Sequence, residues 1–231
     1  MRTLLDKFHT VFYVLHVRTW IWLIVTLISR GPIKGIDNVP KKGACILASN
    51  HMNIAEVPLI SSHFPRRIVW MAKKELFQTP VLNLMYILSG QIPVKRFEAD
   101  MKALRLARRA LQRGHVLGMF PEGTRSKDGR LHAAEPGTAL IAIRTGAPIV
   151  PCAVWGTEDI KLPRDFFRIN RVSMNVGRPF TLPQKKRVTK QDIENGSREI
   201  MRRIAELLPP QYRGEYAADV KDTVGSGTGD A

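Results

Sequence analysis

A histidine and a carboxylate stand five residues apart in the stretch "SNHMNIAE", as His51 and Glu56. A neutral imidazole can accept a proton from a hydroxyl group, and a carboxylate on the other ring nitrogen fixes the tautomer and stabilises the imidazolium. A histidine beside a carboxylate can equally be a polar pair with a structural role only. The two residues therefore predict either general-base chemistry or a structural pair, and the rest of the chain must decide.

Other kinds of catalytic centre have little support in the sequence. Ser49 and Ser126 lie near the residues of interest, but neither stands in a G-x-S-x-G turn, so we do not expect a serine nucleophile. The chain has no Walker-type loop, no G-x-G-x-x-G motif and no paired Cys/His spacing. The sequence therefore predicts no bound cofactor and no metal site.

Three further stretches stand out beside "NHMNIAE" (50–56): "KKELFQTPVLNLMYILSGQIPVKR" (73–96), "FPEGTRS" (120–126) and "IVPCAVWG" (149–156). In this order and spacing, the chain resembles the 1-acylglycerol-3-phosphate acyltransferase (PlsC-like glycerolipid acyltransferase) family. The resemblance runs from about Gly35 to Phe180 and covers nearly two thirds of the chain. "FPEGTRS" is the most specific of the four stretches, because all seven positions match.

The resemblance implies transfer of a fatty acyl group from acyl-CoA or acyl carrier protein to the free hydroxyl of lysophosphatidate, which makes phosphatidate. His51 is then the general base and Glu56 the acid that orients it. The thioester donor is a co-substrate, and no other cofactor is implied. Two alternatives stay open: acylation of another lysolipid or of glycerol 3-phosphate, and a non-catalytic basic lipid-binding protein.

Helix geometry restricts how His51 and Glu56 can meet. Residues five apart on one regular helix point about 140° away from each other, at ~3.6 residues per turn. His51 must therefore lie in the turn after a strand at 43–49, with Glu56 in the first turn of the following helix, where negative charge is favoured. The family's usual acid at this place is Asp, so Glu56 changes the reach of the contact by one methylene.

The resemblance also implies a binding region for the acceptor's phosphate. Its residues are Lys73, Arg96, Glu122, Gly123, Thr124 and Arg125. Gly123 allows the backbone to approach closely, and Arg125 offers a two-pronged guanidinium. A carboxylate such as Glu122 would repel phosphate unless it binds backbone or arginine, so we expect it to have a positioning role.

The elements that must hold these residues alternate along the chain. Strands are predicted at 43–49, 67–72, 91–95, 115–120, 147–155 and 171–177. Helices are predicted at 54–62, 74–89 with a break at Pro80, 98–113, 137–145 and 190–208. We expect one α/β acyltransferase domain over 31–208, with a mixed central sheet flanked by helices. Residues 209–231 are predicted to form a disordered tail.

Residues 1–30 are expected to form a helical segment that associates with a membrane. The run at 11–29 is the most hydrophobic in the chain, but His16 and Arg18 interrupt it, so it lacks the ~20 apolar residues that a spanning helix needs. Trp20 and Trp22 with flanking cations are typical of an interfacial anchor. An ordinary core helix is the alternative.

Charge and cysteine content indicate where the protein acts. Lys and Arg number 36 against 20 Asp and Glu, so the surface attracts anions such as phosphate groups or an anionic membrane. The cations at 98–113 lie opposite an apolar stripe and accompany no base-reading motif, so we expect no nucleic-acid partner. Cys45 and Cys152 stand in apolar runs, which predicts free thiols in a reducing compartment. The expected location is the cytoplasmic face of a membrane.

Overall fold

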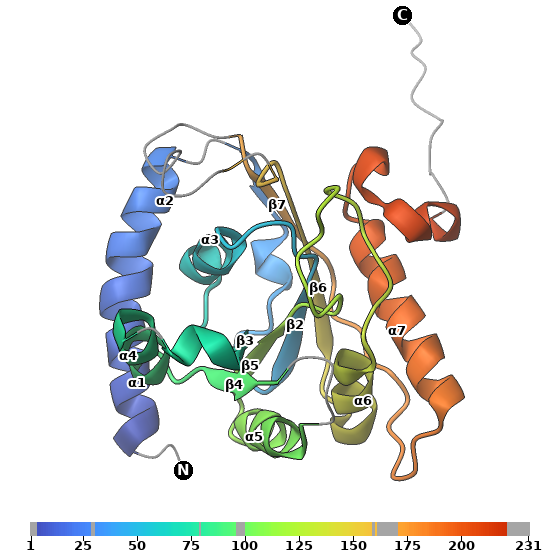
Figure 1. The fold of residues 1–231 in the computed structure, drawn as a ribbon, viewed down its shortest axis with the longest axis horizontal. Coiled ribbons are helices and arrows are strands. Elements are labelled where there is room, and N and C mark those ends of the chain that lie inside the picture. The colour runs from blue at the N-terminus through green and yellow to red at the C-terminus, as the bar shows by residue number, and fades with distance from the viewer. Residues whose placement is uncertain are drawn as a thin grey trace, which may run out of the picture.

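A seven-stranded mixed sheet runs through the middle of the protein (Figure 1). The computed structural model describes residues 4–28, 31–78, 80–95, 100–158, 160 and 171–220. The strands are β1 (Ile33–Lys34), β2 (Cys45–Ser49), β3 (Ile68–Lys73), β4 (Ile92–Val94), β5 (Val116–Met119), β6 (Ile149–Trp155) and β7 (Ser173–Val176). Their order across the sheet is β1-β7-β6-β2-β5-β3-β4. All neighbouring pairs are parallel except β6 and β7, which are antiparallel.

Helices cover both faces of the sheet, because the central strands are apolar on both sides. In β2, Ile46 and Ala48 pack into one core cluster, while Cys45 and Leu47 pack into the other. This alternation follows from the two-residue period of a strand. The first cluster lies under α5 (Met101–Gln112), α6 (Pro136–Thr145) and α7 (Lys190–Ala205); the second lies under α3 (Glu56–His63) and the N-terminal helices.

The predicted elements are confirmed with small shifts. Every predicted strand forms, with ends within two residues of those expected. The break at Pro80 is real: a 3₁₀ segment, η3 (Lys74–Gln78), precedes α4 (Pro80–Leu88). Thr189 and Asp192 form the expected capping box at the start of α7. Two short elements before β2 were missed, β1 and the 3₁₀ turn η2 (Ile36–Asn38), because two or three residues carry no readable period.

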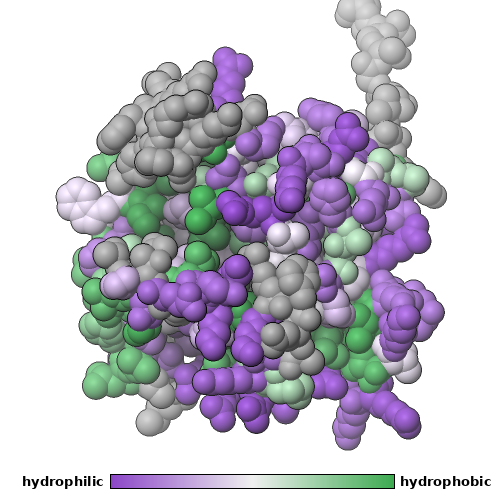
Figure 2. All heavy atoms as spheres, in the orientation of Figure 1, coloured by the Kyte–Doolittle hydropathy of each residue, from purple (hydrophilic) through white to green (hydrophobic). Residues whose placement is uncertain are grey.

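The N-terminal segment is helical throughout its described part, as α1 (Leu4–Leu15), a π-helical turn η1 (His16–Ile21) and α2 (Trp22–Ile28). One side packs on α3, where the Tyr13 hydroxyl donates to the Ser61 carbonyl at 2.8 Å. The opposite side leaves large apolar side chains exposed, and α4 adds more beside it. They are Leu4, Leu5, Phe8, Val11, Val14, Leu15, Trp20, Trp22, Leu23, Leu84, Met85 and Ile87. Figure 2 shows apolar residues gathered on this flank.

The N-terminal helical segment therefore contributes to the core and also presents an apolar surface. A role as a core helix and a role in membrane association are thus compatible. Within the residues that the structure describes, no helix is both long enough and apolar enough to cross a membrane.

The predicted tail needs a correction over its first part. Two 3₁₀ segments, η4 (Pro210–Tyr212) and η5 (Gly214–Asp219), follow α7 and pack on the protein. The Tyr212 hydroxyl donates to Glu158 at 2.6 Å, and buried Arg213 donates to the Leu208 carbonyl at 3.1 Å. The prediction that the disordered tail begins at residue 209 was wrong. It rested on the mainly polar composition of this segment, which does not reveal the few side chains that anchor it. Residues 221–231 lie outside the described part of the chain.

Candidate active site

Four parallel strands end at the same edge of the sheet, and the predicted residues follow them. The neighbours β6, β2, β5 and β3 run in one direction. His51 stands two residues after β2, Glu122 three residues after β5, and Lys73 is the last residue of β3. The carboxyl edge of an open α/β sheet is where such folds bind ligands. The topology therefore collects these residues at one place.

His51 and Glu56 are in direct contact. His51 lies in the turn after β2, and Glu56 is the first residue of α3, as the helix geometry predicted. Nδ1 of His51 is 2.8 Å from Oε2 of Glu56. A carboxylate only accepts, so Nδ1 carries the proton and Nε2 of the neutral ring is an acceptor. This is the tautomer that a general base needs.

Three further donors hold the Glu56 carboxylate, which is fully buried. The Met52 and Asn53 backbone N–H groups donate to it at 2.9 and 3.0 Å. The Thr157 hydroxyl donates to Oε1 at 2.7 Å from the loop after β6. Every group around the carboxylate is a donor, so its orientation toward His51 is fixed by the surrounding structure.

The loop that contains "FPEGTRS" is bonded to the backbone of His51. Oε1 of Glu122 accepts from the His51 N–H at 3.0 Å, and the Ser126 N–H donates to the His51 carbonyl at 2.7 Å. The second oxygen of Glu122 accepts from the His132 N–H at 3.2 Å. Burial raises the pKa of Glu122 to about 7, and the two N–H donors oppose that rise. The geometry is that of a carboxylate that positions the His51 turn.

An aromatic stack supports the imidazole. The rings of His51 and Phe120 are stacked with centroids 3.9 Å apart, and the Trp70 ring also stacks on Phe120, with centroids 4.9 Å apart. Trp70 is itself fixed, because its indole N–H donates to the Ser61 hydroxyl at 2.9 Å. A β-carbon at Gly118 would lie 2.5 Å from Trp70, so this position in β5 leaves room for the stack.

The predicted phosphate-binding residues are only partly brought together. Gly123 has a φ of +68° in the tight turn after β5, and Thr124 and Arg125 beside it are exposed. Arg125 precedes Ser126, whose N–H donates to the His51 carbonyl, so the backbone at Arg125 is close to that of His51. Lys73 lies two strands from β2, which is about 10 Å at the usual strand spacing, and it pairs with Glu75 at 3.8 Å. Arg96 lies outside the described residues.

Comparison with known proteins gives the family. A family model described as Acyltransferase matches residues 32–155, which is more than half of the chain. The chain belongs to the Acyltransferase family.

Named relatives of this acyltransferase-family protein agree with that result. It is 30% identical over 176 residues to 1-acyl-sn-glycerol-3-phosphate acyltransferase of Bacillus subtilis, covering 72% of this chain and 85% of that one. It is 29% identical over 160 residues to a chloroplastic enzyme of the same name from Brassica napus, covering 68% of this chain. The chain spans about half the length of that plant relative, 46%.

A solved structure has the same fold. The crystal structure of the 1-acyl-sn-glycerophosphate acyltransferase PlsC from Thermotoga maritima superposes with a TM-score of 0.64 at 26% identity. The match covers 81% of this chain and 76% of the PlsC chain. The mixed sheet of this acyltransferase-family protein is therefore the PlsC fold, as its sequence predicted.

Two site residues were missed by sequence reasoning. Thr157 binds Glu56 from 101 positions away, and Phe120 supports His51 from 69 positions away. Phe120 opens a recognised motif and Thr157 directly follows one, so motif membership was a usable signal. The sequence did not show that β6 and β5 lie on either side of β2. This strand order places Thr157 and Phe120 beside His51 and Glu56.

Proposed function

We propose that this protein transfers a fatty acyl group from a thioester donor to the free hydroxyl of 1-acylglycerol 3-phosphate, forming phosphatidate. The observation that carries the proposal is the 2.8 Å contact between Nδ1 of His51 and Glu56 at the carboxyl edge of the sheet. It leaves Nε2 of a buried imidazole as a proton acceptor. The names of the Bacillus and Brassica relatives support this choice of acceptor.

The chemistry needs only groups that the site holds. Nε2 of His51 takes the hydroxyl proton as the hydroxyl oxygen bonds to the thioester carbonyl carbon. The C–S bond then breaks, and the imidazolium returns the proton to the departing thiolate. Glu56 stabilises the imidazolium between these two events. No covalent acyl-enzyme is required, because the thioester is reactive enough to be attacked directly.

Binding of the acceptor's phosphate is assigned to the turn after β5. Gly123 and Thr124 offer backbone close to His51, and Arg125 supplies a charged fork. Arg96 and Lys73 are kept as secondary candidates. Glu122 acts on the acceptor indirectly, through its hydrogen bonds to the backbone of His51 and His132.

Membrane association is part of the proposal, because the acceptor is a lipid. The exposed apolar side chains of α1, α2 and α4 form one flank of the protein. With this flank facing a bilayer, the N-terminal helix can lie in the lipid headgroup region. The net charge of +16 favours an anionic leaflet such as the cytoplasmic one.

The proposed function is tested by thiol release from acyl-CoA and from acyl carrier protein with purified protein. The acceptors are lysophosphatidate, glycerol 3-phosphate and a zwitterionic lysolipid. The proposal expects lysophosphatidate to give the highest kcat/KM. Preference for another acceptor would reassign the substrate, and the absence of release with every acceptor would leave a lipid-binding protein.

A further inference from the structure

A groove leads away from the site between α5 and α6. Its first part is a cavity of about 550 Å³ that begins at Phe120 and Gly123. The Phe120 ring is the one that stacks on His51. The second part of the groove is a cavity of about 410 Å³ farther along the same helices. The two cavities share the lining residues Met101, Leu104, Leu140, Ile141 and Arg144. The groove is therefore continuous, with an apolar middle section.

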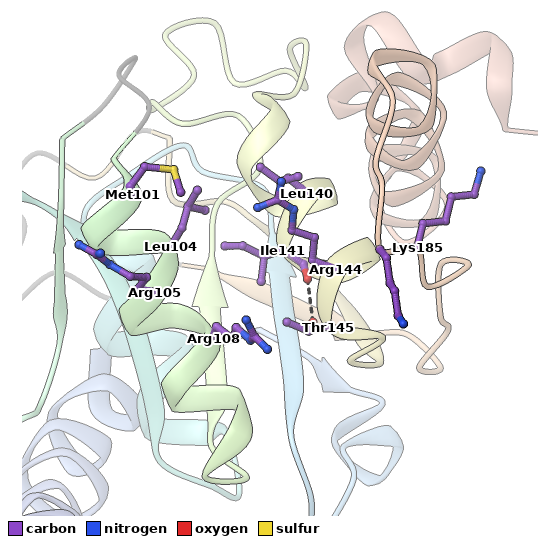
Figure 3. Close-up of a pocket in the computed structure, with 10 residues that line it drawn as sticks. Met101, Leu104, Arg105, Arg108, Leu140, Ile141, Arg144, Thr145 and Lys185 are labelled. Carbon is purple, nitrogen blue, oxygen red and sulfur yellow. Dashed lines mark hydrogen bonds between the residues drawn. The ribbon is translucent and has the colours of Figure 1, made fainter.

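The far cavity is strongly cationic (Figure 3). Among the described residues that line it, the charged ones are Arg105, Arg108, Arg144, Lys185 and Lys186, and none is acidic. Lys185 is partly neutralised by Asp192 at 2.6 Å. Within the described part of the chain, Arg105, Arg108 and Arg144 make no ion pair. Cations from two helices and one loop thus face a common space, and three of them have no ion-pair partner among the described residues, which is suited to a ligand with several negative charges.

Distance separates this anion site from the one proposed for the acceptor. In lysophosphatidate, only four bonds separate the reacting hydroxyl oxygen from the phosphorus, so its phosphate must lie close to His51. Arg108 stands seven residues beyond Met101 on α5, which is about 10 Å farther along the helix axis. In acyl-CoA, by contrast, the whole pantetheine arm separates the thioester from the first phosphate. The far cavity fits the donor and not the acceptor.

The shape of the cavity favours a small polyanionic ligand over a membrane surface or a protein surface. A lipid bilayer would meet the exposed apolar flank of α1 and α4, whereas α6 lies on the other side of α5 (Figure 1). A folded carrier protein is too large to enter a cavity of about 410 Å³, and these cations surround a concave space between two helices. The nucleotide of CoA carries three phosphate groups on one small body, which matches several convergent cations.

We propose that the cationic cavity binds the nucleotide phosphates of an acyl-CoA donor, with the pantetheine arm lying along the α5–α6 groove toward His51. This inference rests on the proposed acyl transfer and names its donor. Arg108 from α5 and Arg144 from α6 are the residues expected to contact phosphate. Leu104 and Ile141 line the apolar passage for the arm.

The test compares two double variants that each remove two positive charges. Arg108→Ala with Arg144→Ala changes the cavity, and Lys102→Ala with Arg109→Ala changes exposed cations of α5 that do not line it. Kinetics are measured in neutral detergent micelles with acyl-CoA, with acyl-pantetheine, which lacks the nucleotide, and with acyl carrier protein. Binding of CoA itself is measured by calorimetry.

The cavity variant should raise the KM for acyl-CoA at least about tenfold, while the control raises it less than about twofold. The KM for lysophosphatidate, and turnover of acyl-pantetheine, should be the same in both. Equal KM values for acyl-CoA in the two variants would overturn the proposal, as would a rise seen only with acyl carrier protein. If no acyl transfer occurs with any donor but CoA binding is lost only in the cavity variant, the inference survives and the proposed function fails.

Discussion

Replacement of Glu56 by Gln separates an orienting acid from a structural carboxylate. The side chains have nearly the same size, so the fully buried site can keep its packing. The amide oxygen can occupy the Oε1 position, where Thr157 and the Asn53 N–H donate. The amide NH₂ group then stands at the Oε2 position, 2.8 Å from Nδ1 of His51. An NH₂ group donates, so Nδ1 must accept and the ring proton moves to Nε2.

The shifted proton removes the base. With Nε2 protonated, the imidazole cannot take a proton from the acceptor hydroxyl, and the imidazolium also loses its counter-charge. The corresponding change in a Ser-His-Asp triad lowers kcat about 10⁴-fold. For Glu56→Gln we expect a loss of about 10²–10⁴ in kcat, or about 3–5 kcal/mol in the activation free energy. The melting temperature should change little, because the hydrogen bonds at Oε1 remain and the Met52 N–H, which is shared between both oxygens, can still donate to Oε1.

The assay is steady-state thiol release with saturating lysophosphatidate, together with thermal unfolding of each variant. Glu56→Asp is the matched variant, since it keeps the charge but withdraws the carboxylate by about 1.5 Å, one C–C bond. All partners of Glu56 lie at 2.7–3.0 Å, so Asp must lose part of them and should have intermediate activity. A Glu56→Gln protein with undiminished kcat would refute the dyad.

Three other predictions follow from the same geometry. Thr157→Val removes the 2.7 Å hydrogen bond to Glu56 and should lower kcat about tenfold, while Thr157→Ser retains activity; equal losses in both would contradict a positioning role. The raised pKa of Glu122, about 7, means that the folded state favours the protonated carboxyl. The free energy of unfolding of the parent, measured relative to that of Glu122→Gln, should therefore fall by about 3 kcal/mol between pH ~4.5 and pH ~7. Denaturant titration of both proteins at each pH measures it. A parent that gains stability over the variant as the pH rises would contradict the raised pKa. Phe8→Glu with Trp20→Glu should reduce co-sedimentation with anionic vesicles more than Lys41→Ala with Lys42→Ala, which changes the net charge equally; equal binding of the two variants would place the membrane contact elsewhere.

The last of these tests depends on what the structure adds about the N-terminus. Residues 1–30 were expected to form a membrane anchor, and deletion would be the obvious experiment on that view. Tyr13 is buried and bonded to α3, and Asp6 is buried near Arg67 and His115. Deletion would therefore expose core as well as remove an anchor. Surface substitutions such as those at Phe8 and Trp20 keep the core intact.

Local patterns predicted most of the fold and half of the site. Strand positions could be read because β2 and β6 are apolar runs bounded by turns, and helix caps such as Thr189 follow from short-range hydrogen bonding. The place of His51 before α3 followed from helix geometry once the family resemblance had paired His51 with Glu56. These are all contacts between residues close in the chain, where the sequence itself restricts the structure.

Contacts between distant segments could not be predicted from the sequence. Thr157 meets Glu56, and Glu122 meets the His51 backbone, only because β6 and β5 flank β2. Arg105 and Arg108 were noted only among the cations at 98–113, and the sequence did not indicate that Arg144 and Lys185 from other elements join them around one cavity. Strand order decided the first two cases and the packing of α5 beside α6 decided the third, and a single sequence contains neither.

The mechanism depends on His51 as the base for acyl transfer to lysophosphatidate. The direct measurement is phosphatidate formation, followed by mass spectrometry, with the purified parent and with His51→Ala under identical conditions. We expect the parent to form phosphatidate and the variant, with an unchanged melting temperature, to do so about 10²–10⁴-fold more slowly. A folded His51→Ala protein that keeps more than about half of the parent's rate would contradict it.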